Sequence, residues 1–224
     1  MLMQTIGQLL PAAVAVALSP IPIIAIVLML GTPKARTNGP AFAAGWVAGL
    51  VVVMVVILFV AGGSDTSSTA SDTVNWLQVA IGVLFLAMAR RQWSGRPKPG
   101  EEAQMPSWMA TIDNVEPSRA VGLGFLLSAV NPKNLALTAS AAASIAQAGL
   151  SDGDQFAAAL AFVIIGSVTV AGSVLFYLVA TEKAAPVLAS VKDFMAAHNA
   201  VIMMVILLIL GVKILGEGLG GLSI

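Results

Sequence analysis

The sequence Ala17-Leu18-Ser19-Pro20-Ile21-Pro22 interrupts a long apolar run, Leu9–Leu30, near its middle. A second apolar run, Ala120–Ala146, is interrupted in the same way by Asn131-Pro132-Lys133-Asn134. Proline lacks a backbone N–H and clashes with the preceding turn, so each motif predicts a break in a helix. Inside a membrane, the freed backbone groups need a cavity or neighbouring helices to satisfy them. One break in each half of the chain is typical of a transporter whose site lies between two structural repeats.

The composition indicates an integral membrane protein. Apolar residues make up 58% of the 224 residues and charged residues only 10%, with a mean hydropathy of +0.94, whereas a soluble domain carries about 25% charged residues. The 11 basic and 11 acidic residues give no net charge, so nucleic acid is not a predicted partner. There is no cysteine, which excludes disulfides and thiolate metal sites. No nucleotide-binding loop, metal cluster or nucleophile–base pair is recognisable, so we predict neither an enzyme nor a cofactor.

The apolar runs predict an all-α, single transmembrane domain over residues 1–224. A bilayer core needs about 20 apolar residues per helix, and six runs meet or approach this length. The predicted spans are Leu9–Leu30, Pro40–Ala61, Trp76–Ala89, Ala120–Ala146, Phe156–Ala180 and Ala200–Gly216.

Lysine and arginine predict the orientation of these spans, because they favour the cytoplasmic side. If the spans alternate, nine basic residues fall on one side: Lys34, Arg36, Arg90, Arg91, Arg96, Lys98, Arg119, Lys183 and Lys192. The opposite loops, Gly62–Asn75 and Gln147–Gln155, contain four aspartates and no basic residue. We therefore predict that both termini lie outside (N-out, C-out).

Three spans in each half would run in opposite orientations, as a 3+3 inverted repeat requires. Repeat one covers residues 1–92, a cytoplasmic loop covers 93–118, and repeat two covers 119–224. Within the loop, the polar, proline-rich segment Gly95–Glu116 predicts flexibility. The segment Pro186–Ala197 predicts either an amphipathic helix at the inner interface or an ordinary connecting helix. Pairs of small residues predict close helix approaches, at Gly45 and Gly49, Gly122 and Gly124, and Gly166 and Gly172.

The residues at the two breaks predict half-helices. Ser19 and Asn131 are favoured N-cap residues, and Pro20 and Pro132 occupy the favoured first helical position. The N-terminus of a half-helix attracts an anionic or carbonyl oxygen. Pro22 lengthens the irregular region in the first span. The alternative is a simple proline kink whose polar groups are satisfied by neighbouring helices.

Lys133 strengthens the functional interpretation. A charge near the bilayer centre costs about 2.5–3.5 kcal/mol, and such residues usually face a cavity or a partner. The first five predicted spans contain no Asp or Glu, and Glu217 is the only carboxylate beside the sixth. Lys133 should therefore bond helix carbonyls and Asn side chains, face an anionic ligand, or reach the interface. The predicted substrate-binding residues are Ser19, Pro20, Pro22, Asn131, Pro132, Lys133 and Asn134.

These motifs resemble the lysine-exporter superfamily. The run Arg119–Asn134 and the stretch Ser19–Gly49 most resemble its GAP branch, the actinobacterial peptidoglycolipid- and sulfolipid-addressing proteins. The resemblance implies a multi-pass protein of the bacterial cytoplasmic (inner) membrane that moves glycolipids toward the cell envelope. Relatives that export amino acids often have a glycine between the two prolines of span one, where this chain has Ile21.

The leading hypothesis is export of a polar or anionic (glyco)lipid whose head group meets a midplane site between the broken helices. One alternative is a small-solute exporter of the same superfamily, for an amino acid or cation. Another is a non-transporting accessory subunit of a lipid-export machine. The predicted partners are membrane lipids, a lipid or small-molecule substrate, and a second copy or lipid-export proteins. The sequence identifies no coupling ion.

Overall fold

The computed structural model describes the backbone of residues 1–62, 68–96, 112 and 115–222, and side chains within 1–60, 75–96, 112 and 115–222. Every element in these residues is helical, which confirms the predicted all-α class. The helices are α1 (Leu2–Ala17), α2 (Pro20–Leu30), α3 (Ala35–Gly62), α4 (Ser68–Ser94), α5 (Pro117–Phe125), the π-helical turn η2 (Leu126–Val130), α6 (Pro132–Gln147), α7 (Asp152–Val179) and α8 (Thr181–Gly221).

Each predicted span coincides with a helix or with a broken helix, although the boundaries differ. Among the described residues, α3, α7 and α8 are long and apolar enough to cross a membrane, and α1 with α2 makes a fourth candidate. The chain is thus an all-helical protein with multi-pass character, and the six-span arrangement stays a prediction. The division into two repeats around a loop also stays a prediction.

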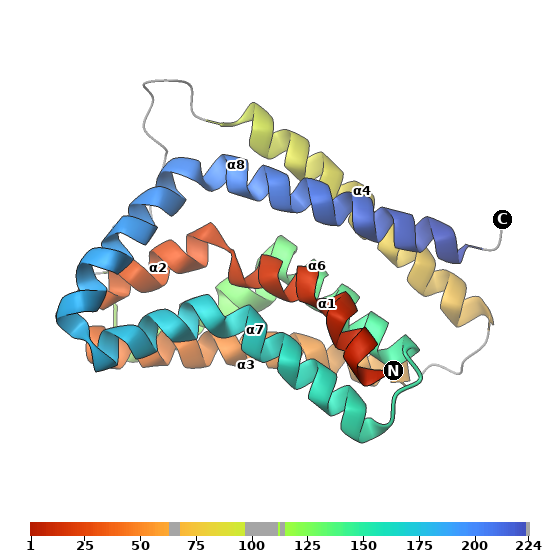
Figure 1. The fold of residues 1–224 in the computed structure, drawn as a ribbon, viewed down its shortest axis with the longest axis horizontal. Coiled ribbons are helices and arrows are strands. Elements are labelled where there is room, and N and C mark those ends of the chain that lie inside the picture. Colours follow the sequence, from red (N-terminus) through yellow and green to blue (C-terminus); the bar gives the residue numbers. More distant parts are fainter. Residues whose placement is uncertain (63–67, 97–111, 113–114, 223–224) are drawn as a thin grey trace.

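The segment Pro186–Ala197 is the first part of the long helix α8. Figure 1 shows this part turning steeply away from the rest of α8. Leu188 is buried, whereas Val187, Val191 and Phe194 are exposed. The apolar side of this segment is therefore only partly packed on the bundle, and three of its apolar residues are exposed.

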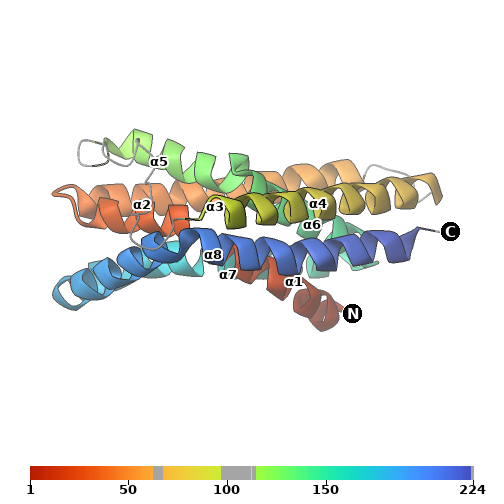
Figure 2. The ribbon, with the colours of Figure 1, turned by 90° about the horizontal axis from the view of Figure 1, so that it is seen from above.

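Several helices approach one another closely at glycines, as two pairs illustrate. Helices α4 and α8 lie side by side (Figures 1 and 2), and a Cβ added at Gly82 would lie 2.7 Å from the backbone nitrogen of Leu215. Helix α3 packs on α5, where a Cβ at Gly124 would lie 2.8 Å from the backbone nitrogen of Trp46. Small residues permit such contacts between membrane helices.

The predicted small-residue contacts are confirmed at some positions and wrong at others. A Cβ at Gly45 or Gly49 would collide with Val121 or Ser128, respectively, and Gly166 lies in close contact with Val16. A Cβ at Gly122 or Gly172 would meet nothing within 4 Å, so these two glycines mark no close approach.

The end of the loop before α5 is not wholly flexible, contrary to the prediction. Residues 97–111, 113 and 114 of the predicted loop lie outside the described ranges. Ile112 and Val115, however, are buried in the core, and the Val115 carbonyl accepts a hydrogen bond of 2.8 Å from Asn38 Nδ2. Apolar contacts and one buried hydrogen bond thus hold the chain where it enters α5.

The two broken helices run in opposite directions. In Figure 2, α1 and α2 run from the N-terminus toward the left, whereas α5, η2 and α6 run from the left toward the right. Their packing is also matched, because α1 and α2 contact α7 while α5, η2 and α6 contact α3. The two breaks meet where α1 contacts α6.

Candidate functional site

The first break separates α1 from α2 at Leu18 and Ser19. Ser19 has extended backbone angles (φ −90°, ψ 106°), and Pro20 begins α2 at its first helical position. The axes of the two half-helices differ by 51°. This confirms the half-helix prediction, with one correction. Ser19 occupies the N-cap position, but its side chain makes no capping hydrogen bond to α2.

Side chains from three elements satisfy the carbonyls that the break releases at the end of α1. These carbonyls lose their helical donors because Ser19 leaves the helix and Pro20 has no N–H. Lys133 Nζ donates to Ala15 O at 2.6 Å, Ser19 Oγ to Val16 O at 2.7 Å, and Thr169 Oγ1 to Ala17 O at 2.6 Å. The C-terminus of α1 is therefore capped by α6, by the linker itself and by α7.

The second break combines a π-helical turn with a proline. Asn131 N donates to Leu126 O, five residues back, at 3.2 Å, and α6 then begins at Pro132. Asn131 Oδ1 accepts the Lys133 N–H at 3.1 Å, which confirms Asn131 as the N-cap. Leu127 O accepts from Asn134 Nδ2 at 2.9 Å. Single π-turns of this kind occur frequently at functional sites.

Ser19, Lys133 and Asn134 form one buried group, here called the central polar cluster. Lys133 Nζ donates to Ser19 Oγ at 2.7 Å, and Ser19 Oγ lies 3.1 Å from Asn134 Oδ1. The three residues are only 2%, 1% and 0% exposed, respectively. The hydroxyl of Ser19 has one hydrogen, so it donates either to Val16 O or to Asn134 at a given moment. The cluster joins the two breaks through side chains from distant parts of the sequence.

The charge of Lys133 is met by neutral groups alone within the described residues. Its Nζ contacts are a carbonyl and a hydroxyl, and the described salt bridges join other lysines, Lys192 to Asp193 and Lys213 to Glu217. The C-terminus of α1 carries a partial negative charge that favours a cation. The expectation that Lys133 bonds a helix carbonyl is thus confirmed, but its second acceptor is the Ser19 hydroxyl and not an Asn side chain. The expectation that it reaches the interface is wrong because it is 1% exposed.

The remaining predicted residues surround this cluster in different ways. Pro20 and Pro22 are buried at the start of α2 and shape the first break. Asn131 is half-buried and Pro132 is exposed, so these two shape the second break from its outer side.

A comparison with protein families identifies the group to which the chain belongs. The family model described as "Sap, sulfolipid-1-addressing protein" matches residues 9–220, which include both breaks and the whole cluster. The chain belongs to this family. No curated protein and no solved structure matches the chain. The sulfolipid-1-addressing family lies within the branch that the sequence resembles, and membership of the wider lysine-exporter superfamily stays a prediction.

Polar residues that the sequence interpretation overlooked also lie in the core of this sulfolipid-1-addressing family member. Thr169 caps α1, and the buried hydroxyls of Thr138 and Ser167 each lack a partner in the described structure. Buried polar atoms usually have a partner, so these two hydroxyls are unusual. Thr138 lies one helical turn after Asn134. The sequence did contain a signal for such residues, because the hydroxyl residues Ser167 and Thr169 lie within the apolar predicted span Phe156–Ala180.

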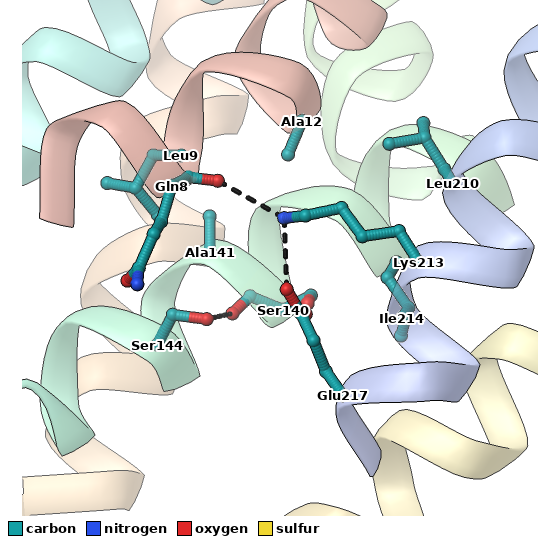
Figure 3. A pocket seen from close by; sticks show the side chains of 10 residues that line it. All are labelled: Gln8, Leu9, Ala12, Ser140, Ala141, Ser144, Leu210, Lys213, Ile214 and Glu217. Carbon is teal, nitrogen blue, oxygen red and sulfur yellow. Dashed lines mark hydrogen bonds and ion pairs between the residues drawn. The ribbon is translucent and has the colours of Figure 1, made fainter. Parts of the chain in front are cut away.

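A second polar site of the family member lies between α1, α6 and α8 (Figure 3). Lys213 Nζ lies 3.1 Å from Glu217 Oε1 and donates to Gln8 O at 3.3 Å. Ser140 and Ser144 line the opposite wall, on α6. The cavity measures about 20 Å³, which is room for about one water molecule. Lys213 and Glu217 pair at i,i+4 spacing within α8, and the bond from Lys213 to Gln8 O ties α8 to α1.

Proposed function

We propose that this protein exports a polar or anionic glycolipid across the membrane, with the head group passing the central polar cluster. The family to which the chain belongs is described as sulfolipid-1-addressing, and a sulfated head group is an anion. The observation that carries the proposal is the buried Lys133, which has neutral partners in place of a carboxylate. A cation of this kind matches an anionic substrate.

The site is closed in this structure, because Lys133 is 1% exposed and both of its side-chain contacts are made. We propose that an anionic head group replaces Ala15 O and Ser19 Oγ as the partner of Lys133 Nζ. The present bonds already have a charged donor, and an anionic acceptor would add the attraction between two opposite charges, which is strong in a low-dielectric interior. The exchange would free the C-terminus of α1 to move at the linker before α2.

We also propose six spans arranged as a 3+3 inverted repeat, with both termini outside. The opposite directions of the two broken helices and their matched packing on α3 and α7 support this proposal. The absence of native cysteine allows a direct test with single cysteines. In intact cells, a membrane-impermeant maleimide should label Gly153→Cys, which lies in the first turn of α7. The same reagent should label Ser118→Cys, at the start of α5, only after the membrane is permeabilised. Labelling of Ser118→Cys in intact cells would contradict the topology.

Export itself is tested with the purified full-length protein in phosphatidylcholine liposomes. A trace lipid carries a fluorophore on its acyl chain and either an anionic or a zwitterionic head group. We expect the protein to speed the movement of the anionic lipid between leaflets and to have little effect on the zwitterionic lipid. The measurement is the fraction of fluorescence that dithionite removes, because dithionite reaches only the outer leaflet.

The same liposomes distinguish the other functions. Transport of radiolabelled amino acids or metal cations without lipid movement would replace the proposal with a small-solute exporter. Movement of neither class by the protein alone would overturn autonomous export, as expected of an accessory subunit.

A further inference from the structure

A separate cavity of about 260 Å³ lies between α2, α7 and α8, at the end of the molecule where the three helices meet in Figure 1. Its apolar wall comes from α2, through Val27, Leu28 and Leu30, and from Leu188 of α8. Tyr177 of α7 and Lys192 of α8 add a phenol and an ammonium group. Pockets that enclose whole small molecules measure roughly 300–1,000 Å³. The cavity is thus large enough for part of a lipid.

The cation in this cavity is available to a ligand. Lys192 lies 3.1 Å from Asp193, but the side chain of Asp193 is 72% exposed, and that of Lys192 is 30% exposed. Ion pairs between such exposed groups contribute little to stability, so an anion can replace Asp193 at little cost. The Tyr177 hydroxyl has no hydrogen-bond partner in the described part of the chain and can donate to the same anion.

The charges near the cavity have a small positive excess, with three lysines (including Lys192) against two carboxylates. Lys34 follows the end of α2 and Lys183 lies at the start of α8, and both are exposed. The acidic residues at this end of α8 are Glu182 and Asp193, which are also exposed. Basic pockets between membrane helices on the cytoplasmic side suit anionic lipid head groups.

The apolar wall makes a lipid the fitting ligand. A water-soluble anion would gain nothing from contact with the apolar wall, whereas an acyl chain would pack against it. Val187, Val191 and Phe194 are exposed on the same part of α8, so this segment offers further apolar surface close to the cavity. We infer that the cavity binds an anionic membrane lipid, with its head group at Lys192 and Tyr177 and the upper part of one acyl chain against α2. Its role as the loading site for export rests on the proposed function.

Lipid binding is measured by native mass spectrometry of the full-length protein, with phosphatidylglycerol and phosphatidylcholine offered in equal amounts. We expect a preference for phosphatidylglycerol that falls about fivefold in Lys192→Gln, the factor equivalent to about 1 kcal/mol per lysine near a membrane surface. Lys192→Arg should keep the preference. Lys213→Gln is the matched control, because Lys213 lies on the same helix but lines a different cavity.

Filling the cavity tests its apolar part. Ala189→Trp should reduce the binding of both lipids, and Ala185→Trp, one turn earlier on the same helix, provides a second filling variant if the first does not fold. An unchanged preference in Lys192→Gln, an equal loss in Lys213→Gln, or full binding in a folded tryptophan variant would each overturn the inference.

Binding and transport can fail separately. If the wild type binds phosphatidylglycerol through Lys192 but moves no lipid in liposomes, the proposed function fails and the lipid site stands. If lipid moves and depends on Lys133, while the Lys192 and Ala189 variants bind lipid normally, the lipid site fails and the proposed function stands.

Discussion

Replacing Lys133 by Met is expected to abolish lipid export and to leave the free energy of unfolding within about 2 kcal/mol of the wild type. Burying an ammonium group costs several kcal/mol. Its bonds to Ala15 O and Ser19 Oγ return about 1.5–3 kcal/mol each, as expected for a charged donor. Methionine keeps the apolar stem and removes the charge, leaving Ala15 O unpaired at a cost of about 1–3 kcal/mol. Because these free-energy terms nearly cancel, Lys133→Met should fold as the wild type does. A loss of export would then be due to the lost charge.

Two further variants separate charge from packing at this position. Lys133→Ala also leaves a cavity, so it should lose about 2–5 kcal/mol, as truncations of buried side chains do. Lys213→Met is the control lysine, since Lys213 also donates to a backbone carbonyl but is partly exposed and has a carboxylate partner. Thermal unfolding in one detergent and lipid movement in liposomes are the two measurements. Wild-type export by Lys133→Met would refute the role of the charge, and a Lys133→Met variant that fails to fold would make Lys133 structural.

The two breaks could be predicted from the sequence because they follow from the covalent structure of proline. Pro20 and Pro132 begin α2 and α6, as the missing N–H and fixed φ angle require. Asn131 caps α6 as expected. The role of Ser19 could not be predicted in the same way. Its hydroxyl turns back to Val16 O because Lys133 and Asn134 approach from another helix.

Which of the predicted surroundings of the Lys133 side chain is found in the structure also depends on tertiary packing. The sequence shows that the residue lacks a carboxylate partner nearby in the predicted spans, but its actual acceptor, Ala15 O, lies 118 positions earlier. The π-turn before Asn131 has no recognisable sequence signal. It shifts the hydrogen bond of Asn131 to Leu126 and so releases the carbonyl of Leu127 for Asn134.

The errors about the loop and the glycines have a common physical cause. The composition of a segment describes its average polarity and does not show which single residues, such as Ile112 and Val115, are buried. Spacing identifies residues on one helix face, but it does not say which face meets a neighbour. Gly124 therefore lies against α3 while Gly122, on the same helix, meets nothing.

The second large effect is expected at Asn134, where substitution by Leu should lower the free energy of unfolding by about 1–3 kcal/mol. Asn134 is fully buried, and both ends of its amide are used, by Leu127 O and by Ser19 Oγ. Leucine is similar in size but cannot donate, so Leu127 O would lose its partner in the core. For a chain of this length the loss corresponds to about 2–4 °C in the unfolding midpoint per kcal/mol.

Thr138→Val is the matched control for Asn134→Leu. Thr138 is also fully buried and lies one turn further along α6, but its hydroxyl has no partner in the described structure. Valine removes that unpaired hydroxyl at nearly constant volume, so the midpoint measured by circular dichroism should stay the same or rise. A fall in Thr138→Val equal to that in Asn134→Leu would attribute both effects to packing. A fall in Asn134→Leu alone would mean that the amide, which links the two half-helix breaks, supplies the lost stability.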